Sequence, residues 1–299
     1  MRTLLTIALL VSTAAAQSGK GPVLVITPSS RDYLLGAGGT LARMSSEGRK
    51  IVVLQIGNEE KDSIGLGPAE TRLANNAEGE AAAKILGVQE VLNLGHKSGE
   101  LGYVSSSELR NHVMAAFRFY KPETVFFPDW YVHYLEDRDV WYVGHMAEEA
   151  PYGGGSLFLQ EFTYMGMGGA AAREYFFYSP NRPYRPREGG EGSARMTHFD
   201  IGPMFDRKVK AAQALKTSNH RYAAQVKLRL DRAGTPSPLL ARVDEQTASD
   251  LVRSYLEELA AAVGKPHGIG LAEEFNHLSP RGGIPEHIRE HARPIAGNR

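Results

Sequence analysis

The fold of this chain is decided by residues 23–41, which read VLVITPSSRDYLLGAGGTL. The run Val23 to Ile26 is apolar and mostly β-branched, and Pro28 follows it, so a short buried strand is predicted here. A helix is expected over residues 40–48, because Leu41 and Met44 share one face and Gly48 follows. The stretch therefore reads as a strand, a loop and a helix, with the glycine block 36–39 just before the helix.

The same alternation continues along the chain. Ser105 and Glu108 have the spacing of a capping box at the start of a later helix. Strand–helix units with short connections predict a mostly parallel sheet with helices on both faces, a Rossmann-like three-layer α/β/α fold. The expected strands are 51–56, 90–94, 124–127, 158–164 and 175–178, and the expected helices are 69–86, 105–120, 139–149, 205–218 and 246–263.

Three segments are expected in the domain organisation. Residues 1–16 combine a positive start, a short apolar run and three consecutive alanines, which is typical of a signal peptide. Its apolar run is too short to span a bilayer, so no integral membrane segment is expected after cleavage, and a secreted or periplasmic protein is predicted. Residues 17–264 form the α/β domain. Residues 265–299 are rich in proline and histidine and are expected to wrap around it as a tail.

Composition excludes several classes of function. Lys and Arg together number 34, as do Asp and Glu, so balanced charge gives no reason to expect nucleic acid as a partner. No cysteine is present, which excludes thiol catalysis and cysteine-ligated metals. The glycine block is separated from its strand by more residues than a dinucleotide-binding fingerprint allows, so NAD binding is not expected.

Ligands of such sheets bind beyond the carboxyl ends of the strands, which directs attention to residues 27–35. This segment resembles the opening of the LmbE/PIG-L family of zinc-dependent de-N-acetylases. In that family the strand is followed by Ala-His-Pro-Asp-Asp-Glu and then by Gly-x-Gly-Gly-Thr, and the second block is similar to residues 36–40. Further similarity at 72–94, 122–128, 200–208 and 272–275 extends the resemblance over roughly residues 22–275.

The resemblance assigns functional positions, and most of them are replaced here. The family's first zinc ligand falls on Ser29, its general base on Arg31 and its second ligand on Asp32. Its later His-Pro-Asp-His motif aligns with residues 137–140, which puts Asp137 and Asp139 in the motif and the third ligand on Val140. Asp32 is thus the only retained ligand position. No confident catalytic residue and no metal or other cofactor are expected, unless a rebuilt site holds zinc.

The replacements have physical consequences. A catalytic zinc ion needs about three protein ligands and an open water position. A guanidinium about 4 Å from an ion repels it by several kcal/mol at an effective dielectric near 20. One hypothesis is that Arg31 fills the vacated cationic space and pairs with Asp32, Asp137 or Asp139. The alternative is that Arg31 points to solvent.

Three functions stay open. The first is a catalytically degenerate deacetylase-like protein, a pseudoenzyme, that binds an N-acetylated sugar or glycoconjugate. Asp32, Arg31, Trp130, Tyr131 and His133 are its candidate substrate-binding residues, although aromatic clusters more often pack. The second is an active amide or N-acetyl-sugar hydrolase rebuilt around Asp32, Asp137, Asp139 and His133, with His145 as a further candidate ligand. The third is a periplasmic interaction module. Oligomeric state is not predicted.

Overall fold

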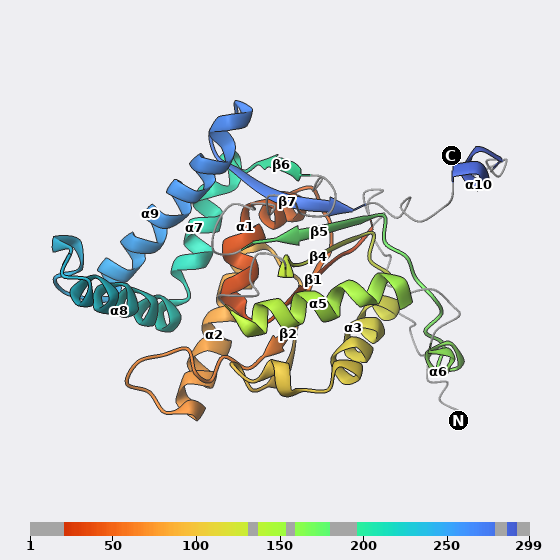
Figure 1. Cartoon of the computed structure of the whole chain (residues 1–299), viewed down its shortest axis with the longest axis horizontal. Coiled ribbons are helices and arrows are strands. Elements are labelled where there is room, and N and C mark those ends of the chain that lie inside the picture. Colours follow the sequence, from red (N-terminus) through yellow and green to blue (C-terminus); the bar gives the residue numbers. More distant parts are fainter. Residues whose placement is uncertain (1–20, 131–136, 154–158, 180–195, 279–285, 292–299) are drawn as a thin grey trace, which may run out of the picture.

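A computed structural model describes residues 21–130, 137–153, 159–179, 196–278 and 286–291. Seven strands form one sheet in the order β3-β2-β1-β4-β5-β7-β6 (Figure 1). The strands from β3 to β5 are parallel, and β7 runs antiparallel to both β5 and β6. The bounds are β1 Val23–Thr27, β2 Ile51–Gly57, β3 Glu90–His96, β4 Thr124–Pro128, β5 Glu174–Tyr178, β6 Met196–Asp200 and β7 Ala272–Leu278. The predicted fold class is confirmed.

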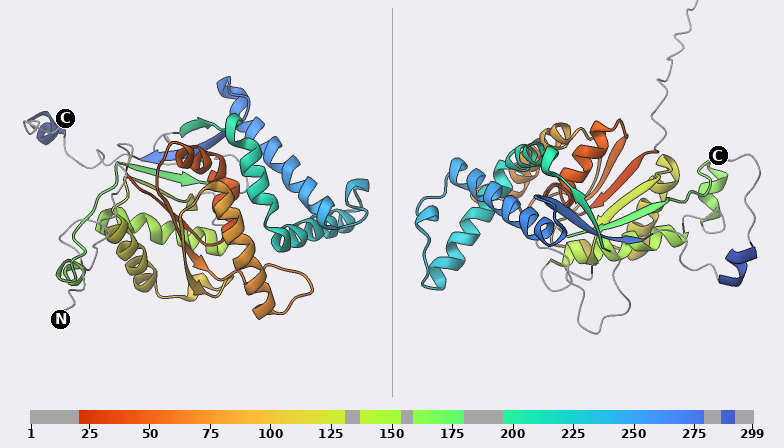
Figure 2. Two further views of the ribbon diagram at one scale, coloured as in Figure 1. Left: turned by 180° about the vertical axis from the view of Figure 1, so that it is seen from behind. Right: turned by 90° about the horizontal axis from the view of Figure 1, so that it is seen from above.

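Helices cover both faces of the sheet (Figures 1 and 2). One face packs on α3 and α5 through a core that includes Leu24, Val113 and Val143. The other packs on α1, α2 and α7, and α9 adds a further layer against α7. The bounds are α1 Ser30–Ser46, α2 Pro68–Leu86, α3 Ser106–Tyr120, α5 Arg138–Gly153, α6 Gln160–Tyr164, α7 Phe205–Gln213, α8 Lys216–Arg232, α9 Glu245–Gly264 and α10 Glu286–His291. Within the described ranges, four 3₁₀ turns lie at Leu101–Tyr103, Gly202–Met204, Pro238–Leu240 and Lys265–His267.

Helix α1 begins at Ser30, ten residues before the predicted start. The prediction was wrong because each interior glycine costs a helix about 1 kcal/mol relative to alanine, which favoured a loop. Tight packing explains the glycines. A Cβ at Gly36 would lie 2.6 Å from the Tyr178 ring, and a Cβ at Gly39 would lie 2.8 Å from Ile201. The block therefore lets α1 approach its neighbours closely.

A buried ion pair forms hydrogen bonds with the backbone of α1 at the same turn. Lys208 and Glu273, from α7 and β7, lie 2.7 Å apart and are both buried. Glu273 accepts from the backbone N–H groups of Gly39 and Thr40, each at 2.8 Å. Lys208 donates to the carbonyl of Leu35, the oxygen that Gly39 N–H would reach in a regular helix. The pair thus substitutes for part of the helical ladder and ties three elements together.

Three further predictions were wrong in the second half of the chain. Residues 160–164, predicted within a strand, form α6, and the predicted helix 205–218 is two helices, α7 and α8. Residues 272–278, expected in a wrapping tail, form β7 inside the sheet, because β7 pairs with strands on both sides.

The proposed signal peptide lies outside the described residues. Among the described helices, none combines the length and hydropathy needed to cross a bilayer.

Candidate functional site

The candidate site lies where β1 and β4, neighbours in the sheet, reach their carboxyl ends. After β1, the next two strands, β2 and β3, are added on one side of β1 in the sheet. The following two, β4 and β5, are added on its other side. Helices α1 and α5 start at this point, the first directly after β1 and the second ten residues after β4. Doubly wound sheets bind their ligands at such a switch in strand order. The structure thus brings residues 29–32 and 137–140 to the same edge of the sheet.

Ser29 and Asp32 together cap the start of α1. Ser29 is the N-cap residue, and its hydroxyl accepts from the backbone N–H of Asp32 at 3.3 Å. The same hydroxyl donates to the Asp32 carboxylate at 2.6 Å. Burial, chiefly, and the nearby Asp137 carboxylate raise the pKa of Asp32 well above its usual value, and the Ser29 hydrogen bond opposes them. Asp32, which the family resemblance gives as the one retained ligand position, therefore takes part in a local capping arrangement.

Glu59 lies beside this cap, in the loop after β2, and was missed by the sequence reasoning. It is 3% exposed and has a left-handed backbone, with φ 54°. Its carboxylate accepts from the backbone N–H and the hydroxyl of Ser30, each at 3.0 Å, and from the Gln55 amide at 2.9 Å. Burial, with Asp62 contributing, raises the pKa of Glu59 to about 7. A buried carboxyl that titrates near neutrality therefore supports the first turn of α1.

Arg31 contacts α8. Its guanidinium lies 4.4 Å from the centre of the Tyr222 ring, and it donates to the Asn219 side-chain oxygen at 3.4 Å. No ion pair within 4.0 Å joins it to Asp32, Asp137 or Asp139, all of which the structure describes. The hypothesis that Arg31 pairs with these carboxylates is therefore wrong, and so is the alternative that it simply points to solvent. The tyrosine face and the asparagine on α8 accommodate the cation instead.

The second segment of the site is also held by local hydrogen bonds. Asp137 accepts from the backbone N–H groups of Asp139 and Val140 at 2.9 and 3.2 Å, and so caps α5. Asp139 accepts from Gly99 and Leu101 N–H, at 2.5 and 3.1 Å, which anchors the loop after β3. Val140 is 1% exposed. The two carboxylates thus support backbone, and Val140, the position that the resemblance gives to the third ligand, carries a buried apolar side chain.

Trp130 packs against α5. Its indole N–H donates to Glu148 at 2.5 Å, and its ring lies edge-on to His145, with centroids 5.1 Å apart. His145 also stacks on Trp141 at 5.6 Å. These contacts hold the end of β4 on the helix. Tyr131 and His133 lie outside the described residues, so the substrate-binding role of this cluster stays a prediction.

The sheet order and the position of the site define a Rossmann-like α/β/α protein with a switch-point site. Residues 24–139 match the family model of the PIG-L proteins, described as GlcNAc-PI de-N-acetylase. The LmbE/PIG-L resemblance inferred from the sequence is confirmed by this match. No curated protein sequence matches the chain.

Solved structures with the same fold carry different activities. N,N′-diacetylchitobiose deacetylase from Pyrococcus horikoshii is 20% identical, with a TM-score of 0.69 over 93% of this chain and 88% of that one. The zinc-inhibited form of teicoplanin deacetylase Orf2 is 14% identical, with a TM-score of 0.54 over 87% and 99%. GalB, the 4-carboxy-2-hydroxymuconate hydratase from Pseudomonas putida, is 20% identical, with a TM-score of 0.59 over 87% and 97%. At these identities the similarity establishes the fold, and the hydratase illustrates that the fold alone does not fix the reaction.

Proposed function

We propose that this chain is a secreted PIG-L-type domain that has lost zinc-dependent de-N-acetylation and binds an N-acetylated sugar or glycoconjugate at the β1/β4 edge. The loss of catalysis rests on one observation: the three family ligand positions have other structural uses. Ser29 and Asp32 bond each other at the cap of α1, and Val140 is buried. One carboxylate, one hydroxyl and one alkyl group do not fit a catalytic zinc ion, which needs about three strong donors.

The rebuilt-hydrolase alternative finds less support in the same contacts. Asp137 accepts two N–H groups at the start of α5, and Asp139 accepts two from the loop after β3. Recruiting either carboxylate to a metal would leave these buried or capping donors without their partner, at roughly 1–3 kcal/mol for each group. A zinc centre rebuilt from Asp137 and Asp139 is therefore disfavoured.

The ligand class is inferred from the fold's other members. Two neighbours in structure are named as deacetylases of a chitobiose and of teicoplanin. Trp130, Trp141 and His145 place aromatic rings beside the start of α5. Such rings can stack on a sugar even where acid–base and metal chemistry is gone.

A restoration experiment tests the catalytic part. The triple variant Ser29→His, Arg31→Asp and Val140→His returns the family's ligands and base around Asp32. We expect wild type with added zinc to release no acetate from N,N′-diacetylchitobiose, whereas a folded triple variant gains measurable release. Zinc-dependent hydrolysis by wild type that is lost in Asp32→Ala would contradict the proposal.

Binding is tested separately from catalysis. Calorimetry with N,N′-diacetylchitobiose and with its de-N-acetylated form is the matched comparison. We expect wild type to bind only the acetylated sugar, and Trp141→Ala to weaken that binding. If wild type binds neither sugar, or binds both with the same affinity, the carbohydrate part of the proposal is wrong. The interaction module would then be the better description.

A further inference from the structure

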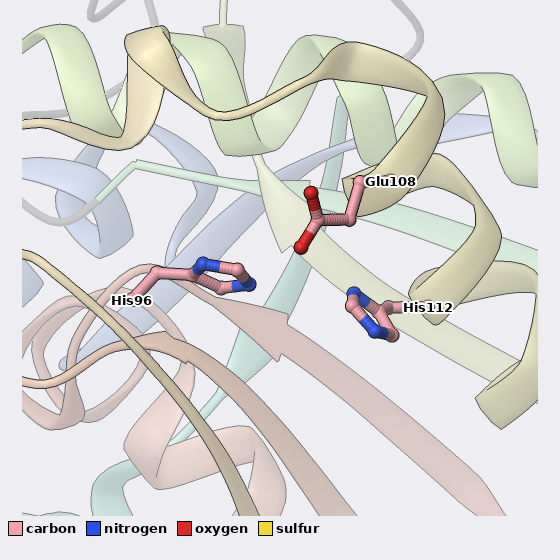
Figure 3. Close-up of side chains that lie close together, drawn as sticks. All are labelled: His96, Glu108 and His112. Atoms are coloured by element: carbon pink, nitrogen blue, oxygen red, sulfur yellow. The ribbon is translucent and has the colours of Figure 1, made fainter.

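Three side chains with metal-binding donors converge at the carboxyl end of the sheet's β3 edge. His96 is the last residue of β3, and Glu108 and His112 lie on α3. Figure 3 shows the two imidazoles and the carboxylate pointing toward one another. One donor atom from each residue lies within 4.8 Å of the others. The side chains therefore already form a small cluster before any ion is present.

Backbone structure fixes the elements that carry these residues. The carbonyl of His96 accepts from Asn58 N–H at 2.8 Å, which holds the end of β3 against the loop after β2. Glu108 and His112 are four residues apart, so they lie one turn apart on the same side of the helix. Their neighbours Leu109 and Val113 are buried in the core and set the rotation of α3. The cluster thus joins an edge strand to a helix at well-anchored positions.

Among the residues that the structure describes, the three side chains have no competing polar partner. Within the part of the chain that the structure describes, none of them makes a hydrogen bond or an ion pair, and the two imidazoles contact each other at a centroid distance of 6.0 Å. The capping box predicted from Ser105 and Glu108 does not form, because Ser105 makes no side-chain capping bond. Glu108 is therefore free to act as a ligand.

We propose that His96, Glu108 and His112 form a binding site for a zinc ion. Two imidazole nitrogens and one carboxylate are a recurrent zinc donor set, and they leave a fourth position for water. In a tetrahedral zinc site, ligand bonds near 2.0–2.1 Å put donor atoms roughly 3.3 Å apart. Small rotations of half-buried or exposed side chains close the present separations to that value. The ion bridges β3 and α3.

This site is distinct from the family's metal position. The sheet order places β3 two strands from β1, and neighbouring strands are about 4.8 Å apart, so the two positions differ by roughly 10 Å along the sheet edge. None of the three residues belongs to segments 29–32 or 137–140. Zinc at the new site would therefore not restore the lost catalytic arrangement around Asp32.

The test uses full-length protein without a histidine tag, titrated with Zn²⁺ by calorimetry. We expect one equivalent to bind wild type, and the double variant His96→Ala/His112→Ala to lose it. Glu108→Gln should weaken binding at least about tenfold, since even the loss of an outer-shell partner costs a site 10–100-fold. Exposed Glu80 on α2 supplies the matched control, and Glu80→Gln should bind as wild type does.

A second control addresses the other histidine pair with helical spacing. His287 and His291 lie four residues apart on α10, and His287→Ala/His291→Ala should keep full affinity. Substituting Co²⁺ for Zn²⁺ gives an absorption spectrum that reports four-coordinate geometry with nitrogen and oxygen ligands. No binding to wild type, or unchanged binding in His96→Ala/His112→Ala, would overturn the proposal. Zinc lost in Asp32→Ala but kept in that double variant would instead place the metal at the family position.

Discussion

Glu59 is a single residue whose environment sets a pH dependence for the whole domain. Burial raises its pKa to about 7, whereas an ordinary glutamate titrates near 4.5. The folded chain therefore holds a proton that the unfolded chain releases at lower pH. Between those values the unfolded state binds fewer protons, so raising the pH favours unfolding. The raised pKa of Asp32 acts in the same direction.

The first prediction follows for Glu59→Gln. From pH 5 to pH 7.5 we expect wild type to lose about 2 kcal/mol of unfolding free energy relative to the variant, because a pKa unit corresponds to about 1.36 kcal/mol and most of the interval between the two pKa values lies in this range. Urea unfolding at both pH values measures the difference. Glu60→Gln, the change at the adjacent residue, should leave the wild-type pH dependence in place. A dependence shared by wild type and Glu59→Gln would show that Glu59 titrates normally.

The second prediction concerns the stacking of Arg31 on Tyr222. A double-mutant cycle of Arg31→Ala and Tyr222→Ala should give a coupling energy of about 0.5–1 kcal/mol, as expected for a cation over an aromatic ring. The matched cycle pairs Arg31→Ala with Asp137→Ala and should give a coupling near zero. If the coupling instead appears only in the aspartate cycle, Arg31 pairs with the carboxylates after all. Thermal or urea unfolding provides the four stabilities of each cycle.

Helix α1 is the element on which the fold and the site both depend. Ser29 caps the start of the helix and Asp32 lies in its first turn. The middle of the helix forms hydrogen bonds with Lys208 and Glu273, which come from distant parts of the chain. Removing one partner of a buried ion pair leaves an uncompensated charge, which costs about 3–5 kcal/mol. The same charge in an exposed pair is solvated by water and contributes little.

The third prediction compares two Lys–Glu pairs of equal length. Lys208–Glu273 is buried, whereas Lys216–Glu245 is exposed, and both lie 2.7 Å apart. Lys208→Met should lower the unfolding free energy by about 3 kcal/mol or more, and Lys216→Met by less than about 1 kcal/mol. Equal effects in chemical unfolding would mean that the buried pair does not hold α1.

The fourth prediction concerns Gly39. In an ordinary helix Gly→Ala stabilises by up to about 1 kcal/mol, but the new Cβ would lie 2.8 Å from Ile201. Gly39→Ala should therefore destabilise by about 1–3 kcal/mol through overpacking. In an Ile201→Gly background, which removes the Ile201 Cβ and Cγ2 atoms that would lie 2.8 Å away, the same substitution should have little cost. Destabilisation that persists in that background would point to a backbone cause.

For the whole molecule, short-range patterns predicted the five parallel strands of the sheet, and long-range contacts determined the rest. The alternation of strands and helices along the chain from β1 to β4 follows from the apolar runs and the helical spacing within each segment. The glycine helix was missed because its stability comes from contacts with Tyr178 and Ile201, far away in sequence. The strand β7 was missed because its seven residues, AEEFNHL, show little apolar alternation, and its pairing with β5 and β6 holds it.

The residues of the candidate site could be proposed from the sequence, but the contacts that these residues make could not. Ser29, Arg31, Asp32 and Val140 were identified through the family frame, and the structure supplies their actual uses. Glu59 carried no motif, and only its place directly after β2 could have drawn attention to it. The metal cluster joins two elements, so only the Glu108–His112 spacing was visible in the sequence.

The most direct test of the central claim is a zinc titration of His96→Ala/His112→Ala, a background that separates the family position from the β3 cluster. The double variant should bind no stoichiometric zinc, because Ser29, Asp32 and Val140 provide too few donors. One equivalent that binds this background and disappears when Asp32→Ala is added would contradict the account and identify a working metal site at the end of β1.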